Sequence, residues 1–309
     1  MAATVRLLGR RESAAAYRHQ QGAFDLAQRL PQLVVAAKEV AANVRHGVHG
    51  RRQAGIGETF WQFRPFVAGE STTRIDWRRS ARDDRTYVRE REWEAAHTVW
   101  IWMDRSPSMG FVSSLALEPK VDRAIVLGLA AAELLVRGGE RVGIPGLTRP
   151  IASRAIIDRL AEAMLVDPRV EAELPPGDPL PARSQAILIS DLLTGAEAIE
   201  SSIATLSSRG ARGHVVMIAD PVEETFPFEG HTEFADVDSR ERLRVGEAQS
   251  FRPIYAARLV AHRDRIREAC VRRGWSFALH RTDGPASAAL LALRTRLEGG
   301  PSMLDVRPG

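Results

Sequence analysis

Three short runs of the sequence are apolar at every position, and helix-like segments separate them. The runs are residues 99–103, 186–189 and 215–218. A strand that is apolar on both faces is typical of a parallel sheet covered by helices on both sides. The alternation of such strands with amphipathic helices predicts an α/β fold with a doubly wound, mostly parallel sheet.

Helical spacing and turn residues predict the remaining elements. Pro119 begins an expected helix that runs to Arg137 and contains the longest apolar stretch, residues 124–136. Apolar residues at spacings of three and four predict further helices around 156–164, 199–206, 255–269 and 290–297. A short strand is expected at 141–144, an edge strand at 275–279 and a proline-rich loop at 174–181.

The pattern divides the chain into four predicted parts. Residues 1–50 are expected to form a helical segment and a basic linker, with Pro31 starting a second helix. Residues 51–96 form a β-rich extension, residues 97–298 the α/β domain and residues 299–309 a tail. Three β-like runs in the extension, 59–63, 74–77 and 86–93, carry aromatic residues between arginines and acids.

Two interpretations of this extension stay open. It is either a small sheet fastened to the main domain by arginine–carboxylate pairs or a docking surface for a partner. Trp and Arg dominate interface hot spots. The candidate partner contacts are therefore the charged and aromatic residues of the extension: Arg64, Arg74, Asp76, Trp77 and Arg82.

Charge and cysteine content restrict the class of protein. The net charge of +4 comes from arginines interspersed with acids, which is typical of a solvated, ion-paired surface and makes nucleic-acid binding the less favoured function. Cys270 is the single cysteine, so an intrachain disulfide is excluded, and we expect it on the apolar face of a helix. The sequence predicts neither a signal peptide nor a membrane span, and we expect a cytoplasmic protein.

Acidic residues follow all three apolar runs. Asp104 follows the first, Ser190-Asp191 the second and Asp220 the third. In open α/β sheets, ligands bind beyond the carboxyl ends of the strands, near the point where strand order reverses. These acids therefore mark the expected site.

The loop after the first run carries the most specific pattern, Asp104-x-Ser106-x-Ser108. One carboxylate and two hydroxyls at alternate positions supply hard oxygen ligands, with Asp191 as a second carboxylate, and such ligands suit Mg²⁺ or Mn²⁺. The alternative is that Ser106 or Ser108 only caps the following helix. We expect the Asp104 carboxylate to face solvent, so that its removal leaves the fold nearly intact.

This pattern resembles the metal-ion-dependent adhesion site of von Willebrand factor A domains. The preceding segment resembles the family called domain of unknown function 58, whose signature matches Arg64-Pro65-Phe66, Arg74-Ile75-Asp76-Trp77 and Val88-Arg89-Glu90, and later Asp220-Pro221-x-Glu223. The resemblance covers roughly residues 50 to 300. It implies a von Willebrand A-like fold and an adaptor or assembly role beside a MoxR-type AAA+ ATPase and its client complex.

One position departs from the adhesion-site pattern. Such a site also uses a threonine, and Thr148 is the only threonine between Ser108 and Asp191, earlier than expected. The site is therefore predicted to be incomplete, with weak metal binding or none. The guanidinium of Arg105 is a candidate substitute for the charge of the cation.

These observations favour a non-enzymatic, metal-assisted protein-interaction module. The first alternative is a metal-dependent hydrolase or phosphotransferase that uses Asp104, although no recognised catalytic motif is present. A Ser106 nucleophile would need a base, and His97 or His214 is the candidate in space. The second alternative is a nucleic-acid-binding protein that uses the arginines of residues 74–91.

Overall fold

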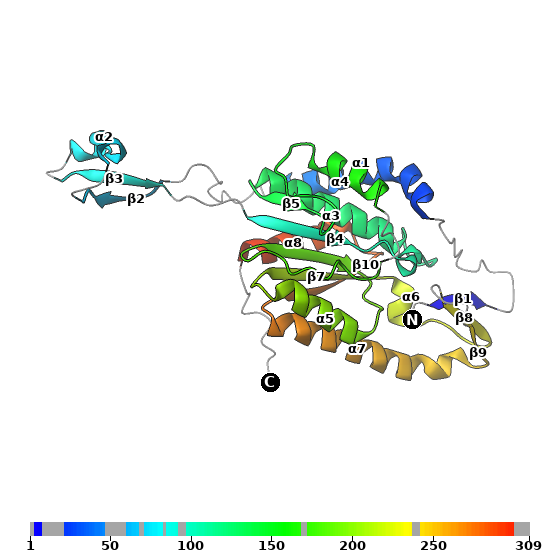
Figure 1. The fold of residues 1–309 in the computed structure, drawn as a ribbon. Helices are drawn as coiled ribbons and strands as arrows, with labels where there is room; N and C mark the ends of the chain where they lie inside the picture. The colour runs from blue at the N-terminus through cyan, green and yellow to red at the C-terminus, as the bar shows by residue number, and fades with distance from the viewer. Residues whose placement is uncertain are drawn as a thin grey trace. The chain divides into compact units, whose positions relative to one another are not determined.

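The chain has 309 residues, and the computed structural model describes residues 3–7, 22–46, 60–67, 71–82, 85–91, 97–167, 172–236 and 242–299. It divides into two compact units (Figure 1). One unit comprises residues 1–48 together with 97–309, and the other comprises residues 49–96. The predicted tail lies outside the described residues from position 300 onward.

A parallel sheet of five strands forms the centre of the larger unit, in the spatial order β10-β7-β6-β4-β5. All neighbouring pairs in this sheet are parallel. The predicted α/β class is therefore confirmed, and two of the three apolar runs, those in β4 and β6, are paired with each other. The strands are β4 (Thr98–Met103), β5 (Arg141–Gly143), β6 (Gln185–Ser190), β7 (Arg212–Ala219) and β10 (Ser276–Arg281).

Strand order reverses between β4 and β6. The second strand along the chain, β5, lies on one side of β4, whereas the third, β6, lies on the other side. At such a reversal the two loops leave the sheet in opposite directions and open a crevice at the carboxyl ends of the strands. Asp104 and Asp191 directly follow these two strands, so both lie at this point.

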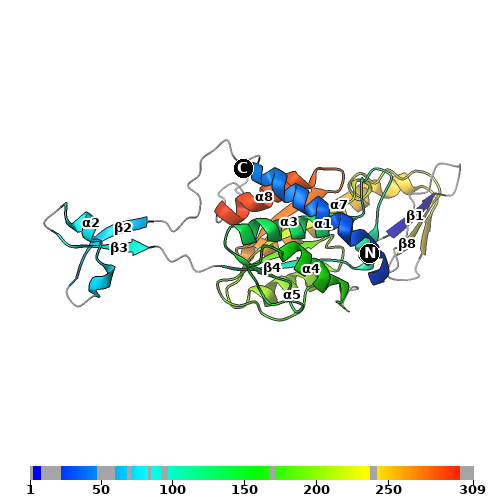
Figure 2. The ribbon, with the colours of Figure 1, turned by 90° about the horizontal axis from the view of Figure 1, so that it is seen from above.

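Helices cover both faces of the sheet (Figures 1 and 2). One layer contains α3 (Lys120–Arg137), α4 (Ile156–Leu165) and α8 (Ala286–Gly299), which share a core with Val99, Ile101 and Met103 of β4. The other contains α5 (Ala196–Ser207) and α7 (Arg252–Arg272), which share a core with Trp102. Because alternate residues of one strand enter opposite cores, the strand is apolar throughout.

Two predictions about buried segments are confirmed. The apolar stretch 124–136 lies within α3, which packs against the sheet, and Cys270 is buried on α7. Among the helices of the described residues, we find none with the length and apolar content that crossing a bilayer requires.

Helix α1 (Gly22–His46) is continuous and contains Pro31 in its interior. The prediction of a second helix starting at Pro31 is therefore wrong. Proline removes one hydrogen bond and costs a helix roughly 3 kcal/mol. Here Leu30, Leu33 and Ala37 continue one buried stripe against the core that contains α3, and Pro31 itself is exposed. The packing of that stripe outweighs the local cost.

A small antiparallel sheet with the order β1-β8-β9 accompanies the main sheet. Its strands are β1 (Ala3–Leu7), β8 (Thr232–Asp236) and β9 (Arg242–Val245). The prediction that the first residues are helical is wrong for β1, because its hydrogen-bonding partner β8 lies more than two hundred positions away in the sequence. Three short helices complete this unit: η2 (Pro107–Gly110), α6 (Pro221–Thr225) and η3 (Ala248–Phe251).

The smaller unit contains the antiparallel pair β2 (Phe60–Pro65) and β3 (Tyr87–Arg91). Between them lie η1 (Thr72–Arg74) and α2 (Trp77–Ser80). Two of the three predicted β-like runs are strands, but 74–77 is not. Asp76 caps α2 by accepting a hydrogen bond from the Arg79 amide (2.9 Å), which stabilises a helical turn in place of a strand.

Candidate functional site

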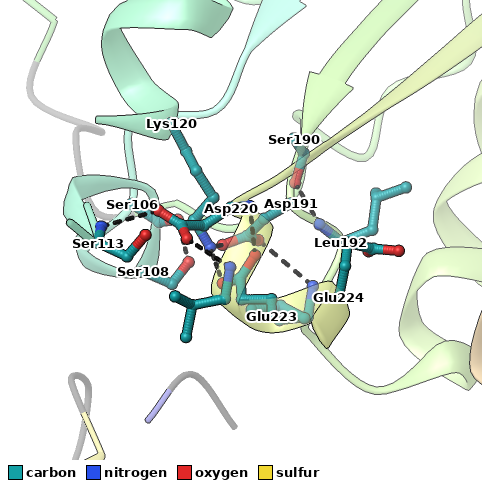
Figure 3. Close-up of polar contacts among 12 residues, drawn as sticks. Ser106, Ser108, Ser113, Lys120, Ser190, Asp191, Leu192, Asp220, Glu223 and Glu224 are labelled. Atoms are coloured by element: carbon teal, nitrogen blue, oxygen red, sulfur yellow. Dashed lines mark hydrogen bonds and ion pairs between the residues drawn. The ribbon is translucent and has the colours of Figure 1, made fainter. Parts of the chain in front are cut away.

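Asp104 and Asp191 emerge from neighbouring strands at the reversal of strand order. Met103 pairs with Ile189 in the β4–β6 ladder, and the Asp104 amide donates to the Ile189 carbonyl (2.9 Å). The residues that follow therefore start side by side, and Figure 3 draws Ser190 and Asp191 together with Ser106 and Ser108 of the loop after β4.

The Asp104 carboxylate is buried, with only 1% of the residue exposed. The expectation that it faces solvent is therefore wrong. Its Oδ1 accepts a hydrogen bond from the Ser106 amide (2.8 Å), and its Oδ2 accepts one from the Ser190 hydroxyl (2.6 Å). Burial, and then the nearby charge of Asp191, raise the pKa of Asp104 to about 7. An added positive charge would stabilise the ionised form of this group.

The hydroxyls of Ser106 and Ser108 face each other, with their oxygens 3.3 Å apart. Both residues are buried. Ser106 is the N-cap residue of η2, but its side chain makes no capping hydrogen bond. The alternative that Ser106 only caps the following helix is therefore wrong. Two oxygens that bind one Mg²⁺ at right angles, each about 2.1 Å from the ion, lie about 3 Å apart. The serine pair is close to that spacing.

Lys120, the first residue of α3, places an ammonium group in the same crevice (Figure 3). It is 0% exposed, and its Nζ donates to Asp191 Oδ2 (2.8 Å) and to Glu223 Oε1 (2.6 Å). The two carboxylates hold its pKa above the usual lysine range although burial acts in the opposite direction. Sequence reasoning missed this group. The available signal was that one of only two lysines begins the helix after the site loop.

Glu223 is held in place by a capping box on α6. Its Oε2 accepts from the Asp220 amide (2.8 Å), and Asp220 Oδ1 accepts from the Val222 amide (2.9 Å). The other Asp220 oxygen accepts from the Ser113 amide (2.8 Å) and so ties the loop after η2 to the end of β7 (Figure 3). The Asp-Pro-x-Glu pattern thus serves to orient Glu223 toward Lys120. Asp220 acts as a cap in this arrangement.

The charges at this site do not balance. Asp191 and Glu223 share one ammonium, the Asp104 carboxyl lies close to Asp191, and burial raises the pKa of Glu223 as well as that of Asp104. Within the described residues, no cluster of three or more His, Cys, Asp or Glu has metal-binding geometry. The hydroxyls of Ser106 and Ser108 and the carboxylates of Asp104 and Asp191 are hard oxygen donors with an excess of negative charge. Such a set of donors fits a divalent cation.

Two other candidates for the site lie elsewhere. Arg105 donates to the Met164 carbonyl (2.8 Å) and pairs with Asp167, so its guanidinium does not take the place of a cation beside Asp104. The Thr148 hydroxyl accepts a hydrogen bond from the Ile144 amide (2.8 Å) within the turn after β5. Lys120, which the sequence did not single out, supplies the positive charge instead.

The histidines proposed as bases lie away from Ser106. His97 precedes β4 at its amino end, where its carbonyl accepts from the Arg141 amide, whereas the site is at the carboxyl end of the same strand. The His214 ring is hydrogen-bonded to Ser276 (2.9 Å) near the start of β7. The amino and carboxyl ends of parallel strands lie at opposite edges of the sheet. Neither histidine is therefore placed to act as a base for Ser106, contrary to the expectation.

The candidate partner contacts lie in the smaller unit. Trp77 is 66% exposed, and Arg82 is also exposed. Asp76 is partly buried and caps α2. The side chains of Arg64 and Arg74 lie outside the described residues. An exposed tryptophan is compatible with the docking interpretation, which stays a prediction.

A family model described as "protein of unknown function DUF58" matches residues 62–265, about two thirds of the chain. The match begins in β2 and ends within α7, so it includes the whole of the strand-end site described above. No curated protein and no solved structure matches the chain.

Proposed function

The chain belongs to the DUF58 family of unknown function, and we propose that it is a non-enzymatic protein-interaction module. Its strand-end site would bind Mg²⁺ or Mn²⁺ through Asp104, Ser106, Ser108 and Asp191. A carboxylate from a partner protein would then complete the coordination of the ion.

The observation that supports this proposal is the convergence of four oxygen-bearing side chains at the reversal of strand order. Asp104 and Asp191 come from adjacent strands, and the two serine oxygens are 3.3 Å apart. Mg²⁺ usually keeps several waters and uses few protein ligands, so open positions remain for a partner. When bound, the ion would supply a hard positive charge that attracts a carboxylate.

Lys120 makes this proposed site weak. Its ammonium already neutralises part of the charge of Asp191 through a 2.8 Å contact. A divalent cation at the serines would lie near this positive charge, and the repulsion lowers its affinity. A partner's carboxylate offsets that repulsion, so metal and partner would bind better together than separately.

A binding role is favoured over catalysis by the surroundings of the serines. Within the described residues, the hydroxyl of Ser106 is partnered by Ser108, and the ring of His262 is engaged with the Leu192 carbonyl (2.6 Å). A serine nucleophile needs a base within hydrogen-bonding distance. The experiments described next also test two alternatives. One is a hydrolase or phosphotransferase that uses Asp104, and the other is an arginine-rich nucleic-acid-binding protein.

The proposed partner is a MoxR-type AAA+ ATPase acting with this chain on a client complex. This choice rests on the resemblance to von Willebrand A proteins that work beside such ATPases. A pull-down from native lysate with wild-type protein, Asp104→Asn and chelator-treated wild type tests it. Recovery of an ATPase by the wild type alone supports the metal bridge. Equal recovery in all three removes the metal from the proposal, and recovery of nucleic acid in place of protein contradicts it.

Calorimetry with MgCl₂ and MnCl₂ tests the metal directly. We expect weak, saturable binding to the wild type, weaker binding to Ser108→Ala and none to Asp104→Asn. Asp158→Asn is the matched control, because this carboxylate is exposed on α4 and pairs with Lys38 and not with a residue of the site. Identical titrations for wild type and Asp104→Asn would refute the metal site. Metal-dependent turnover of p-nitrophenyl phosphate that Asp104→Asn abolishes would favour the hydrolase.

A further inference from the structure

An apolar pocket of about 470 Å³ lies next to the strand-end site, between α6, the strands β8 and β9, and the first half of α7. Phe111 and Glu223 line this pocket, and both also contact Lys120: Glu223 by an ion pair and Phe111 by placing its ring 5.7 Å from the ammonium. The pocket and the site therefore share a wall.

Four aromatic side chains make the inner wall rigid. The Phe226 ring stacks on Phe234 (5.7 Å between centroids) and contacts Phe228 (5.0 Å) and Tyr255 (4.7 Å). Phe226 itself has a left-handed backbone (φ 44°) where α6 ends, which is uncommon for a bulky residue. Contacts within the aromatic cluster compensate for this conformation and preform the pocket.

The rim of the pocket is apolar and exposed. Leu243 of β9, Phe251 of η3 and Ile254 of α7 all line it and are each more than 40% exposed. Isolated exposed apolar residues are common, but a cluster around a concave surface marks an interaction site. The polar groups of the wall are already engaged, since the Tyr255 hydroxyl donates to the Glu223 carbonyl (2.8 Å) and His262 is bonded to Leu192.

The mouth of the pocket carries a positive charge. Glu223 is ion-paired with Lys120, and among the described residues we find no acidic partner for Arg258, which lines the pocket from an exposed position on α7. An apolar cavity with a cationic group at its mouth complements an apolar group flanked by negative charge. A pocket of this size has room for one or two large side chains.

We propose that this pocket receives a hydrophobic side chain from an acidic peptide segment of the partner protein. The segment would contact Arg258 with one of its acids. This inference deepens the proposed function, since an acid of the same segment is suited to completing the neighbouring metal site. The pocket supplies the apolar anchor that a carboxylate–metal contact alone lacks, because buried anchors provide most of the binding energy at interfaces.

Random twelve-residue peptides displayed on phage provide the test, selected against immobilised wild-type protein in MgCl₂. We expect enriched sequences that combine an aromatic or branched aliphatic residue with nearby Asp or Glu. Enriched peptides are then titrated by fluorescence anisotropy against Ile254→Glu, Arg258→Glu and Val260→Glu. Val260 is the matched control, since it is on the same helix and as exposed as Ile254 (56% each) but does not line the pocket.

Ile254→Glu should weaken binding about tenfold or more, as expected for an interface anchor site. Arg258→Glu should weaken it about threefold to tenfold, as expected for a charge at a rim. Val260→Glu should bind within about twofold of the wild type, since surface changes outside an interface are nearly neutral. Basic consensus sequences, no enrichment, or equal binding to Ile254→Glu would overturn the proposal. Dimerisation of the wild type that Ile254→Glu abolishes would overturn it in favour of a second copy of the chain.

Titrations in EDTA and with Asp104→Asn separate this inference from the proposed metal site. Peptide binding that is unchanged under both conditions but lost in Ile254→Glu supports the pocket and contradicts the metal bridge. Binding that is lost in EDTA but unaffected by Ile254→Glu and Arg258→Glu supports the metal bridge and overturns the pocket.

Discussion

Lys120→Met should destabilise the protein strongly, although the side chain keeps nearly the same length. The ammonium is fully buried and donates to Asp191 (2.8 Å) and Glu223 (2.6 Å). Removing one partner of a buried ion pair leaves an uncompensated charge and costs roughly 3–5 kcal/mol. Here two carboxylates lose their partner at once, so we expect the upper part of that range at pH 8.

The pH dependence of this loss follows from the signs of the pKa changes. The pKa of Lys120 is raised in the folded state, so its stabilising contribution is complete at neutral pH and is lost only in strongly alkaline solution. In Lys120→Met, Glu223 loses the counter-ion that holds its pKa down against burial, so it accepts a proton more readily. The destabilisation should therefore be largest at pH 8 and smaller at pH 5.

Urea denaturation followed by far-ultraviolet circular dichroism measures the free energy of unfolding. The chain offers its own control, because Lys38, the other lysine, forms a half-exposed pair with Asp158 (2.9 Å). Lys38→Met should cost less than about 1 kcal/mol. The double variant Lys120→Met/Asp191→Asn should recover part of the loss, since it removes one of the two unpaired charges. A loss below about 1 kcal/mol in Lys120→Met would refute the reasoning about the buried pair.

Three further outcomes are expected. Asp104→Asn should stabilise the protein above pH 7, by up to about 4 kcal/mol for a pKa raised from 3.8 to about 7. The gain should fall as the pH is lowered from 7 to 3.8 and vanish only below that window, where the wild-type carboxyl is protonated in both states. Denaturation at several pH values checks this, and a gain that grows as pH falls would contradict it. Pro31→Ala should raise the free energy of unfolding by about 1–3 kcal/mol, because alanine, a strong helix former, replaces an exposed proline inside α1. An unchanged denaturation midpoint would show that Pro31 does not destabilise the helix. Gly213→Val should destabilise by more than about 3 kcal/mol, because a Cβ at this position would meet the Trp275 ring at 2.3 Å, and thermal unfolding would show whether β7 tolerates it.

Much of the main fold could be predicted from the sequence because its signals are local. The runs 99–103, 186–189 and 215–218 are apolar at every position, and that pattern corresponds to strands with a core on each face. The acids that end these strands follow directly in the chain, so their placement at one edge of a parallel sheet required only the fold class. The residues matched by the family model, 62–265, include these strand-end acids.

Other features depend on residues that are far apart in the sequence. The five residues of β1 show no sequence pattern that predicts a strand. Their extended conformation depends on pairing with β8. Pro31 predicts a helix start by its local preference, but the buried stripe of α1 continues across it. The run 74–77 has aromatic and β-branched residues typical of a strand, yet the capping hydrogen bond of Asp76 makes it a helical turn.

The electrostatic character of the candidate site was decided by tertiary structure alone. Lys120 reaches Asp191 and Glu223 across 71 and 103 sequence positions, and no local pattern shows which helix start will point into the crevice. The Asp104 carboxylate is likewise buried by segments that the loop sequence does not contain. A sequence shows which charges a chain carries, whereas desolvation and Coulomb interactions depend on the distances and burial that only folding produces.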